Sequence, residues 1–173
     1  MSTGTAQEQR LVTYLRSIGW MNIVHDDQKV KPVLGLPPGP GIKCADVLGF
    51  SSEDQKKSTR IVVAESKGTD IPSALHQIGN AAAGVYECFG QNRQVRLLLY
   101  TNALRNVKGK LSPGPGYFAE PLGKPHLYRI IDATKSMTGA EVHPECDLAF
   151  PYSKWRPIVA RMNIELYVEI LPS

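Results

Sequence analysis

The sequence of 173 residues contains no hydrophobic run long enough to cross a membrane, so no membrane partner is expected. Its first residues lack a basic segment followed by an apolar core, and we therefore expect no signal peptide. It shows no internal repeat and no coiled-coil heptad pattern. The three cysteines are an odd number without paired spacing, which favours a reduced, cytoplasmic compartment over a secreted one.

The composition is that of an ordinary globular protein, with 42% hydrophobic and 21% charged residues. We expect one domain over residues 1–173, large enough to bury a core without disulfide bonds. The net charge of +4 and an isoelectric point near 9.0 favour an anionic partner, and DNA fits this preference.

The stretch from Arg60 to Lys67 has the pattern of a buried strand that ends in charged residues. Its first half is β-branched and apolar. Because strand side chains alternate between two faces, Glu65 and Lys67 share a face with Ile61 and Val63. An acid and a base therefore end an apolar face.

The preceding predicted strand, Ile42 to Phe50, carries one charge on its apolar face, Asp46. We expect the two strands to form an antiparallel hairpin through a polar turn. The apolar pattern predicts these pairs across the hairpin: Phe50 with Ile61, and Leu48 with Val63. This register puts Asp46 directly opposite Glu65.

Two carboxylates on a buried apolar face repel each other and lose hydration, so the arrangement requires a cation. Lys67 supplies part of that charge, and a divalent metal would supply more. Oxygen ligands from Asp46 and Glu65, with a backbone carbonyl such as that of Ser66 and waters, suit Mg²⁺ or Mn²⁺ better than zinc. The alternative is an ordinary ion pair on a solvated strand.

This constellation resembles the PD-(D/E)xK nuclease superfamily, whose acidic residue on one strand and Glu-x-Lys on the next are present here as Asp46 and Glu65-Ser66-Lys67. The sequence departs from the motif at Ala45, where the family often has proline. The resemblance implies an α/β restriction-endonuclease-like core, with a central mixed β-sheet flanked by helices, over about residues 7–104. Residues 126–171 would complete or decorate the sheet.

The activity implied by the resemblance is metal-dependent hydrolysis of DNA phosphodiester bonds. Asp46 and Glu65 would hold Mg²⁺ or Mn²⁺, which lowers the pKa of the attacking water, while Lys67 orients or helps to deprotonate that water. Family members that cut both DNA strands usually pair, so the resemblance also implies a homodimer.

Two further residues match catalytic positions of the family. Glu8 lies on a predicted first helix, Thr5 to Ile18, where many members carry a glutamate that joins the metal site. The alternative is a capping box, in which Glu8 bonds back to the amide of Thr5. Gln77 lies early in a predicted helix that is capped by Thr69 or Asp70 and runs to Phe89, and it is either part of the site or exposed and idle.

The remaining predicted strands are Trp20 to His25, Gln94 to Thr101, His126 to Asp132, and Ile164 to Ile170. Residues 26–41 and 102–125 are rich in proline and glycine and are predicted to be loops. The first is either a plain exposed loop or a segment that lies along the substrate. The second is either a mobile surface loop or, with its basic and aromatic residues, a DNA contact. Ser153 is predicted to cap a last short helix.

Two other functions remain open from the sequence. The first is a catalytically silent DNA-binding or assembly subunit with the same fold. The second is a different hydrolase or an interaction domain in which Asp46 and Glu65 are solvated. Clustering of Asp46, Glu65 and Lys67 in one concave site would argue against the solvated alternative.

Overall fold

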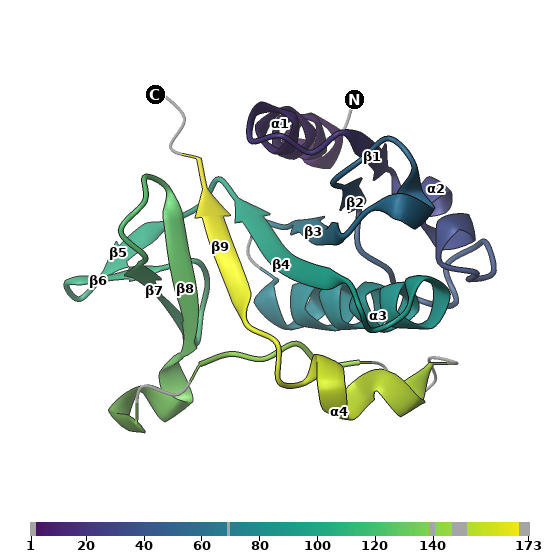
Figure 1. Ribbon diagram of the computed structural model, residues 1–173. Coiled ribbons are helices and arrows are strands. Elements are labelled where there is room, and N and C mark those ends of the chain that lie inside the picture. Colours follow the sequence, from purple (N-terminus) through teal and green to yellow (C-terminus); the bar gives the residue numbers. More distant parts are fainter. Residues whose placement is uncertain (1–2, 69, 139–140, 147–151, 170–173) are drawn as a thin grey trace.

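A computed structural model describes residues 3–68, 70–138, 141–146 and 152–169. It has a mixed seven-stranded sheet flanked by helices, as predicted for the class (Figure 1). In spatial order the strands of this sheet are β1 (Asn22–His25), β2 (Val47–Phe50), β3 (Arg60–Ser66), β4 (Gln94–Thr101), β9 (Ile164–Val168), β8 (Leu127–Asp132) and β7 (Tyr117–Pro121). The α-helices are α1 (Thr3–Ser17), α2 (Asp27–Val33), α3 (Ile71–Phe89) and α4 (Arg156–Val159), and the 3-10 helices are η1 (Gln55–Lys57), η2 (Ala133–Thr138) and η3 (Ser153–Trp155).

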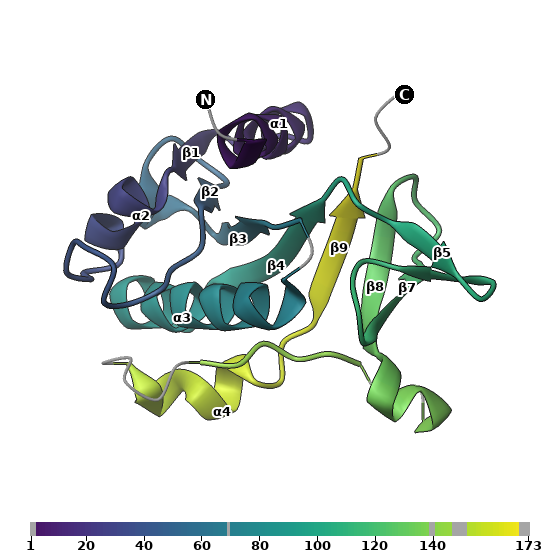
Figure 2. The same cartoon turned by 180° about the vertical axis from the view of Figure 1, so that it is seen from behind.

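The helices α1 and α3 cover opposite faces of the β2–β3–β4 part of the sheet (Figures 1 and 2). Apolar residues of α1, such as Leu11 and Leu15, pack with Val62 and Ala64 of β3. The hydrophobic core between α3 and the sheet is larger than the one under α1, and it includes Val63 of β3. Because every described residue of β3 from Ile61 to Glu65 is buried, the strand has the continuous apolar pattern of a strand covered on both faces.

The predicted hairpin register is confirmed. β1, β2 and β3 form an antiparallel meander, and the α3 crossover leads to β4, which pairs parallel with β3. The pairs across the β2–β3 hairpin include Phe50 with Ile61 and Leu48 with Val63. β2 is shorter than predicted, because the regular ladder starts only at Val47, one residue after Asp46.

The prediction of a plain loop over residues 26–41 is wrong, since this segment contains α2. The Asp26 side chain caps the helix by accepting a hydrogen bond from the backbone N–H of Gln28 at 3.1 Å. Val30 and Leu34, one turn apart, are fully buried. The helix forms although Pro32 lies inside it, where proline cannot donate a backbone hydrogen bond.

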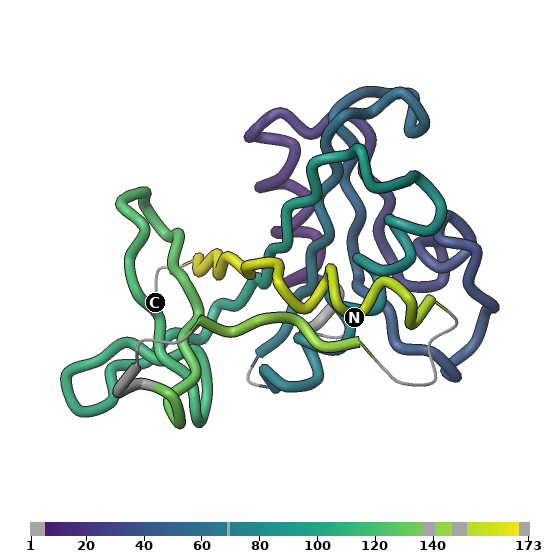
Figure 3. The backbone as a smooth tube through the Cα atoms, turned by 60° about the horizontal axis from the view of Figure 1, so that its bottom comes forward, coloured from purple at the N-terminus to yellow at the C-terminus, as the bar shows by residue number. Residues whose placement is uncertain are grey.

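The prediction of a single loop over residues 102–125 is also wrong. It contains the small sheet of β5 (Arg105–Val107) and β6 (Lys110–Ser112), and then β7. The β5–β6 turn uses Lys108 and Gly109, both with positive φ. Figure 3 shows this part of the chain, together with β8, gathered at one side of the molecule, away from α1 and α3.

The C-terminal segment inserts into the sheet instead of extending its edge. β9 pairs parallel with β4 on one side and antiparallel with β8 on the other. Ser153 lies inside η3, so its predicted role as a cap is wrong, and Tyr152 precedes the helix without a side-chain cap. The predicted strand end at Ile170 lies outside the described residues. Within the described ranges, no helix combines the length and apolar character needed to cross a membrane.

Candidate metal site at the end of β3

The candidate site lies where β2 begins and β3 ends. Val47 pairs with Ala64, so the next position outward brings Asp46 opposite Glu65. Asp46 Oδ2 accepts a hydrogen bond from the backbone N–H of Ser66 at 3.2 Å, which ties the two strands together at this point. The predicted juxtaposition of Asp46 and Glu65 is therefore confirmed.

Glu65 is an acid in an unfavourable environment for its charge. Only 1% of its surface is exposed. Burial raises the pKa of the Glu65 carboxyl well above its ordinary value, and the neighbouring Asp46 adds to this through a shared hydrogen bond and its charge. Lys67 acts in the opposite direction and lowers the Glu65 pKa in part. Glu65 therefore holds its proton more tightly than an exposed glutamate does, unless a cation takes the place of that proton.

Three buried side-chain oxygens in the described part of the chain have no hydrogen-bond partner: Glu65 Oε2, Ser66 Oγ and Gln77 Oε1. An unpaired buried acceptor costs about 1–3 kcal/mol, so each calls for an explanation. Gln77 lies in the second turn of α3, the helix that directly follows the site and packs against β3. The prediction that Gln77 is exposed and idle is wrong for its amide oxygen, which is buried.

Glu8 approaches the same site from α1. Its Oε2 lies 3.3 Å from Nδ1 of His25, the last residue of β1. Burial raises the Glu8 pKa, and the charge of Asp46 is the next largest cause. α1 begins at Thr3, so Thr5 lies inside the helix and the capping-box alternative is wrong.

His25 is a site neighbour that the sequence analysis did not identify. It pairs with Val47 across the β1–β2 ladder, next to Asp46 along the chain. The strand pattern alone gave no sign of this role, because the contact with Glu8 depends on how α1 packs against β1.

Lys67 directly follows β3, and its backbone N–H donates to the carbonyl of Tyr100 at 3.0 Å. Its side chain is half-buried. Among the described residues, the Lys67 ammonium has no ion-pair partner within 4.0 Å, although its charge acts on Glu65. The ammonium is thus close enough to act on the charge of Glu65, and no ion pair with a described residue neutralises it.

No family model, curated protein or solved structure matches this chain. Its function therefore has to be argued from the site itself.

The oxygen donors fit a hard cation better than a soft one. In the described ranges, no three His, Cys, Asp or Glu side chains form a group that could hold a metal ion. A metal at Asp46 and Glu65 would need further oxygen ligands, from a backbone carbonyl, an amide or water. Mg²⁺ and Mn²⁺ accept this mixture, since Mg²⁺ commonly uses one or two carboxylates and keeps several waters. The unpaired Glu65 Oε2 and Gln77 Oε1 agree with such a donor set.

The segment that leads into Asp46 is fixed by two buried side chains. The Lys31 ammonium donates to the carbonyl of Gly39, and the side-chain amide of Asn80 donates to the carbonyl of Lys43 at 2.8 Å. Lys31 and Asn80 are at most 1% exposed. These contacts replace the regular strand that was predicted for residues 42–46.

Asn80→Ala is expected to lower the free energy of unfolding by about 1–3 kcal/mol, because the Lys43 carbonyl loses its buried donor. Divalent metal binding should weaken as well, since Asp46 is held less firmly. Urea unfolding and calorimetric titration with Mn²⁺ measure the two effects. The exposed Asn92 gives a matched control, and Asn92→Ala should change stability by less than about 0.5 kcal/mol. Equal losses in both variants would contradict the role of Asn80.

Proposed function

We propose that this chain is a Mg²⁺- or Mn²⁺-dependent endonuclease that hydrolyses DNA phosphodiester bonds. One observation carries the proposal: the Glu65 carboxyl is buried against Asp46, and its Oε2 has no hydrogen-bond partner in the described part of the chain. The order α1, β1, β2, β3, α3, β4 supports the resemblance to a restriction-endonuclease-like core. The α2 helix is an addition between β1 and β2.

In this proposal each residue has a distinct task. Asp46 and Glu65 hold the metal, with the Ser66 carbonyl and Gln77 as further oxygen donors. The metal supplies Lewis-acid activation of water and neutralises charge at the phosphate. Lys67 orients the attacking water and stabilises the negative charge that builds up on the phosphate oxygens. Glu8 lies at the edge of the site, where burial and the charge of Asp46 raise its pKa.

Cleavage of plasmid, linear duplex, branched and single-stranded DNA tests the proposal, with Mg²⁺ or Mn²⁺ present. The native protein is expected to cut at least one substrate. Asp46→Ala and Lys67→Ala are expected to remain folded by circular dichroism but to lose cleavage by about a thousand-fold or more. Glu53→Ala and Lys29→Ala, which change exposed side chains outside the site, should retain activity.

Two results together would overturn the catalytic proposal: no substrate is cut, and calorimetry finds no divalent binding that depends on Asp46 and Glu65. The chain would then be better explained as a silent DNA-binding or assembly subunit of the same architecture. Family members that cut both strands usually pair, so the proposal includes a homodimer, and sedimentation of the native protein measures whether it forms.

A further inference from the structure

The β5–β6 hairpin is a basic ribbon that follows the end of β4. From residue 102 to residue 119 the chain carries three cations, Arg105, Lys108 and Lys110, and no aspartate or glutamate. All three residues are exposed, and no described residue forms an ion pair with them. The hairpin therefore presents positive charge that the protein does not neutralise, which suits an anionic ligand.

A pocket of about 590 Å³ adjoins this hairpin and is formed by β5, the turn after β6 and the start of β7. Its described lining is mostly apolar and aromatic and includes Val107, Tyr117 and Phe118, and Arg105 is the one charged residue of that lining. Val107 is 47% exposed, so the pocket has an apolar side chain open to solvent. A nucleobase next to its phosphate matches this combination of an aromatic, apolar surface and a cation.

The wall of the pocket is held in place by hydrogen bonds. The buried hydroxyl of Ser112 donates to the carbonyl of Tyr117 at 2.7 Å. The backbone N–H of Tyr117 donates to the carbonyl of Gly114 at 3.2 Å, and that of Ala133 donates to the carbonyl of Gly116 at 2.7 Å. The pocket is thus preformed, and a ligand does not have to order this turn.

The pocket lies at the end of the sheet that holds the metal site. β3 and β4 are parallel, and β5 follows the end of β4 after a short connection (Figure 2). Ala103, which lines the pocket, donates its backbone N–H to Thr101 Oγ1 at 3.1 Å, and this hydroxyl donates to the carbonyl of Gly68 at 3.0 Å. Because Gly68 directly follows Lys67, two hydrogen bonds link the pocket wall to the segment that carries the ammonium.

The pocket also lies on the same face of the sheet as Glu65. Leu104 and Tyr117 pack against the hydrophobic core between α3 and the sheet, and this core includes Val63, which shares its strand face with Glu65. Burial raises the pKa of Tyr117, and the charge of Asp70, the N-cap of α3, is among the charges that add to this. The pocket and the metal site therefore lie on either side of the start of α3.

We propose that this pocket holds an unpaired base of the DNA strand that the metal site cuts, while Arg105, Lys108 and Lys110 contact the neighbouring phosphates. This inference rests on the proposed nuclease function and adds a substrate class, single-stranded or branched DNA. A perfect duplex keeps its bases stacked and paired, so filling the pocket from a duplex costs the free energy of unpairing a base. Stacking and phosphate contacts give affinity without sequence preference.

Fluorescence anisotropy tests the base pocket, with EDTA present to prevent cleavage. The ligands are a labelled 20-nucleotide single strand, its duplex, and a strand of the same length with abasic sites in place of all its nucleosides. The native protein should bind the normal strand about ten-fold more tightly than the abasic strand, and more tightly than the duplex. Phe118→Leu should remove the preference over the abasic strand, because leucine is apolar but offers no ring for stacking, and Phe118→Tyr should keep it. The comparison in the native protein does not depend on whether a variant folds.

The same measurement tests the phosphate contacts. Arg105→Ala/Lys110→Ala should weaken binding of the normal and the abasic strand alike, by about ten-fold at low salt. The slope of log affinity against log salt should become shallower by about 1.4, since two phosphate contacts to a single strand are lost.

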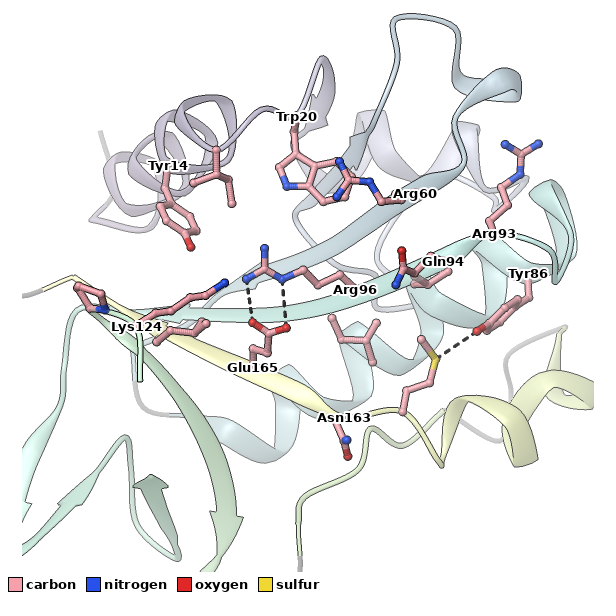
Figure 4. A pocket seen from close by; sticks show the side chains of 16 residues that line it. Tyr14, Trp20, Arg60, Tyr86, Arg93, Gln94, Arg96, Lys124, Asn163 and Glu165 are labelled. Atoms are coloured by element: carbon pink, nitrogen blue, oxygen red, sulfur yellow. Dashed lines mark hydrogen bonds and ion pairs between the residues drawn. The ribbon is translucent and has the colours of Figure 1, made fainter. Parts of the chain in front are cut away.

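A matched pair of cations on the other face of the sheet serves as the control. Arg60 and Lys124 line a separate cavity of about 800 Å³, which is also lined by Tyr14 of α1 (Figure 4). Both residues are exposed, and replacing them by alanine removes the same charge as the hairpin variant does. Arg60→Ala/Lys124→Ala should change affinity for the single strand by less than about two-fold.

Equal affinity of the native protein for the normal and abasic strands would overturn the inference, as would tighter binding of the duplex. An unchanged salt slope in the hairpin variant, or an equal loss in the control pair, would overturn the phosphate contacts. The two proposals fail separately. If the pocket is wrong, metal-dependent cleavage persists and Phe118→Leu cuts with native KM and kcat. If the nuclease is wrong, no substrate is cut, while Phe118→Leu still loses the preference for the normal strand.

Discussion

Replacing Glu65 by Gln is expected to abolish metal-dependent cleavage and, at the same time, to stabilise the metal-free protein above neutral pH. The first effect follows because an amide cannot supply the charge that a divalent cation requires. The second follows because the folded state binds the Glu65 proton more tightly than the unfolded chain does. A site that is optimised for stability would not show the second effect.

The direction of the pH dependence follows from the raised pKa. Below the ordinary glutamate pKa, both states are protonated and the stabilising contribution of Glu65 is fully present. As pH rises from that value through the raised pKa, the native state must give up a proton that it holds more tightly, and stability falls by up to about 1.4 kcal/mol per pH unit. Glu65→Gln does not titrate, so its stability advantage should grow across this window.

Thermal unfolding between pH 5 and pH 9, in EDTA and then in Mg²⁺, measures both effects. Mg²⁺ should stabilise the native protein more at high pH, because the metal binds the deprotonated pair, and should leave Glu65→Gln unchanged. Glu53→Gln, at an exposed position, serves as the control and should follow the native curve. A native curve that rises with pH relative to Glu65→Gln would contradict the raised pKa of the buried Glu65 carboxyl.

Gly79→Ala is expected to lower the free energy of unfolding by about 2–4 kcal/mol, although alanine is the better helix former. A methyl group built on Gly79 would clash with the carbonyl oxygen of Glu145, which is backbone and cannot swing aside. The approach is tight because Cys146 Sγ donates to the Gly79 carbonyl at 3.2 Å and holds the segment on α3. The small residues of α3 thus bring the helix close to this segment as well as to the sheet.

Gly84 on the same helix provides the matched control. Its added methyl would meet only the Leu34 side chain, at 3.1 Å, which can shift by a few tenths of an ångström. Gly84→Ala should therefore lie between a loss of about 0.5 and a gain of about 1 kcal/mol. Urea unfolding measures both variants. A stable Gly79→Ala protein would mean that the Glu145–Cys146 segment does not pack against α3.

The hairpin that carries Asp46 and Glu65 could be predicted from sequence because its information is local. Two apolar strands with period two and one short turn allow few registers, and only one of them buries every apolar side chain on one face. The charges on these apolar faces, Asp46 on the first strand and Glu65 with Lys67 on the second, then marked the site. Lys67 followed from the same alternation.

The residues around that hairpin depend on packing between distant elements, which a single sequence does not report. Whether Glu8 and Gln77 belong to the site was open, because this depends on how α1 and α3 rest on the sheet. α2 was not predicted because Pro32 and the neighbouring prolines and glycines indicate a loop. Asp26 as a cap and Val30 as an apolar residue were signals of the helix in the sequence.

The position of β9 has a consequence for how the protein is made. β9 is the central link between β4 and β8, yet it is the last strand of the sheet to be synthesised. Until residue 168 has left the ribosome, the apolar edge of β4 stays open and the β7–β8 pair has no place to dock. Nascent chains therefore pass through a state with an unpaired hydrophobic strand, which is the kind of species that chaperones protect. The sheet is therefore completed from its middle, once β9 has been synthesised.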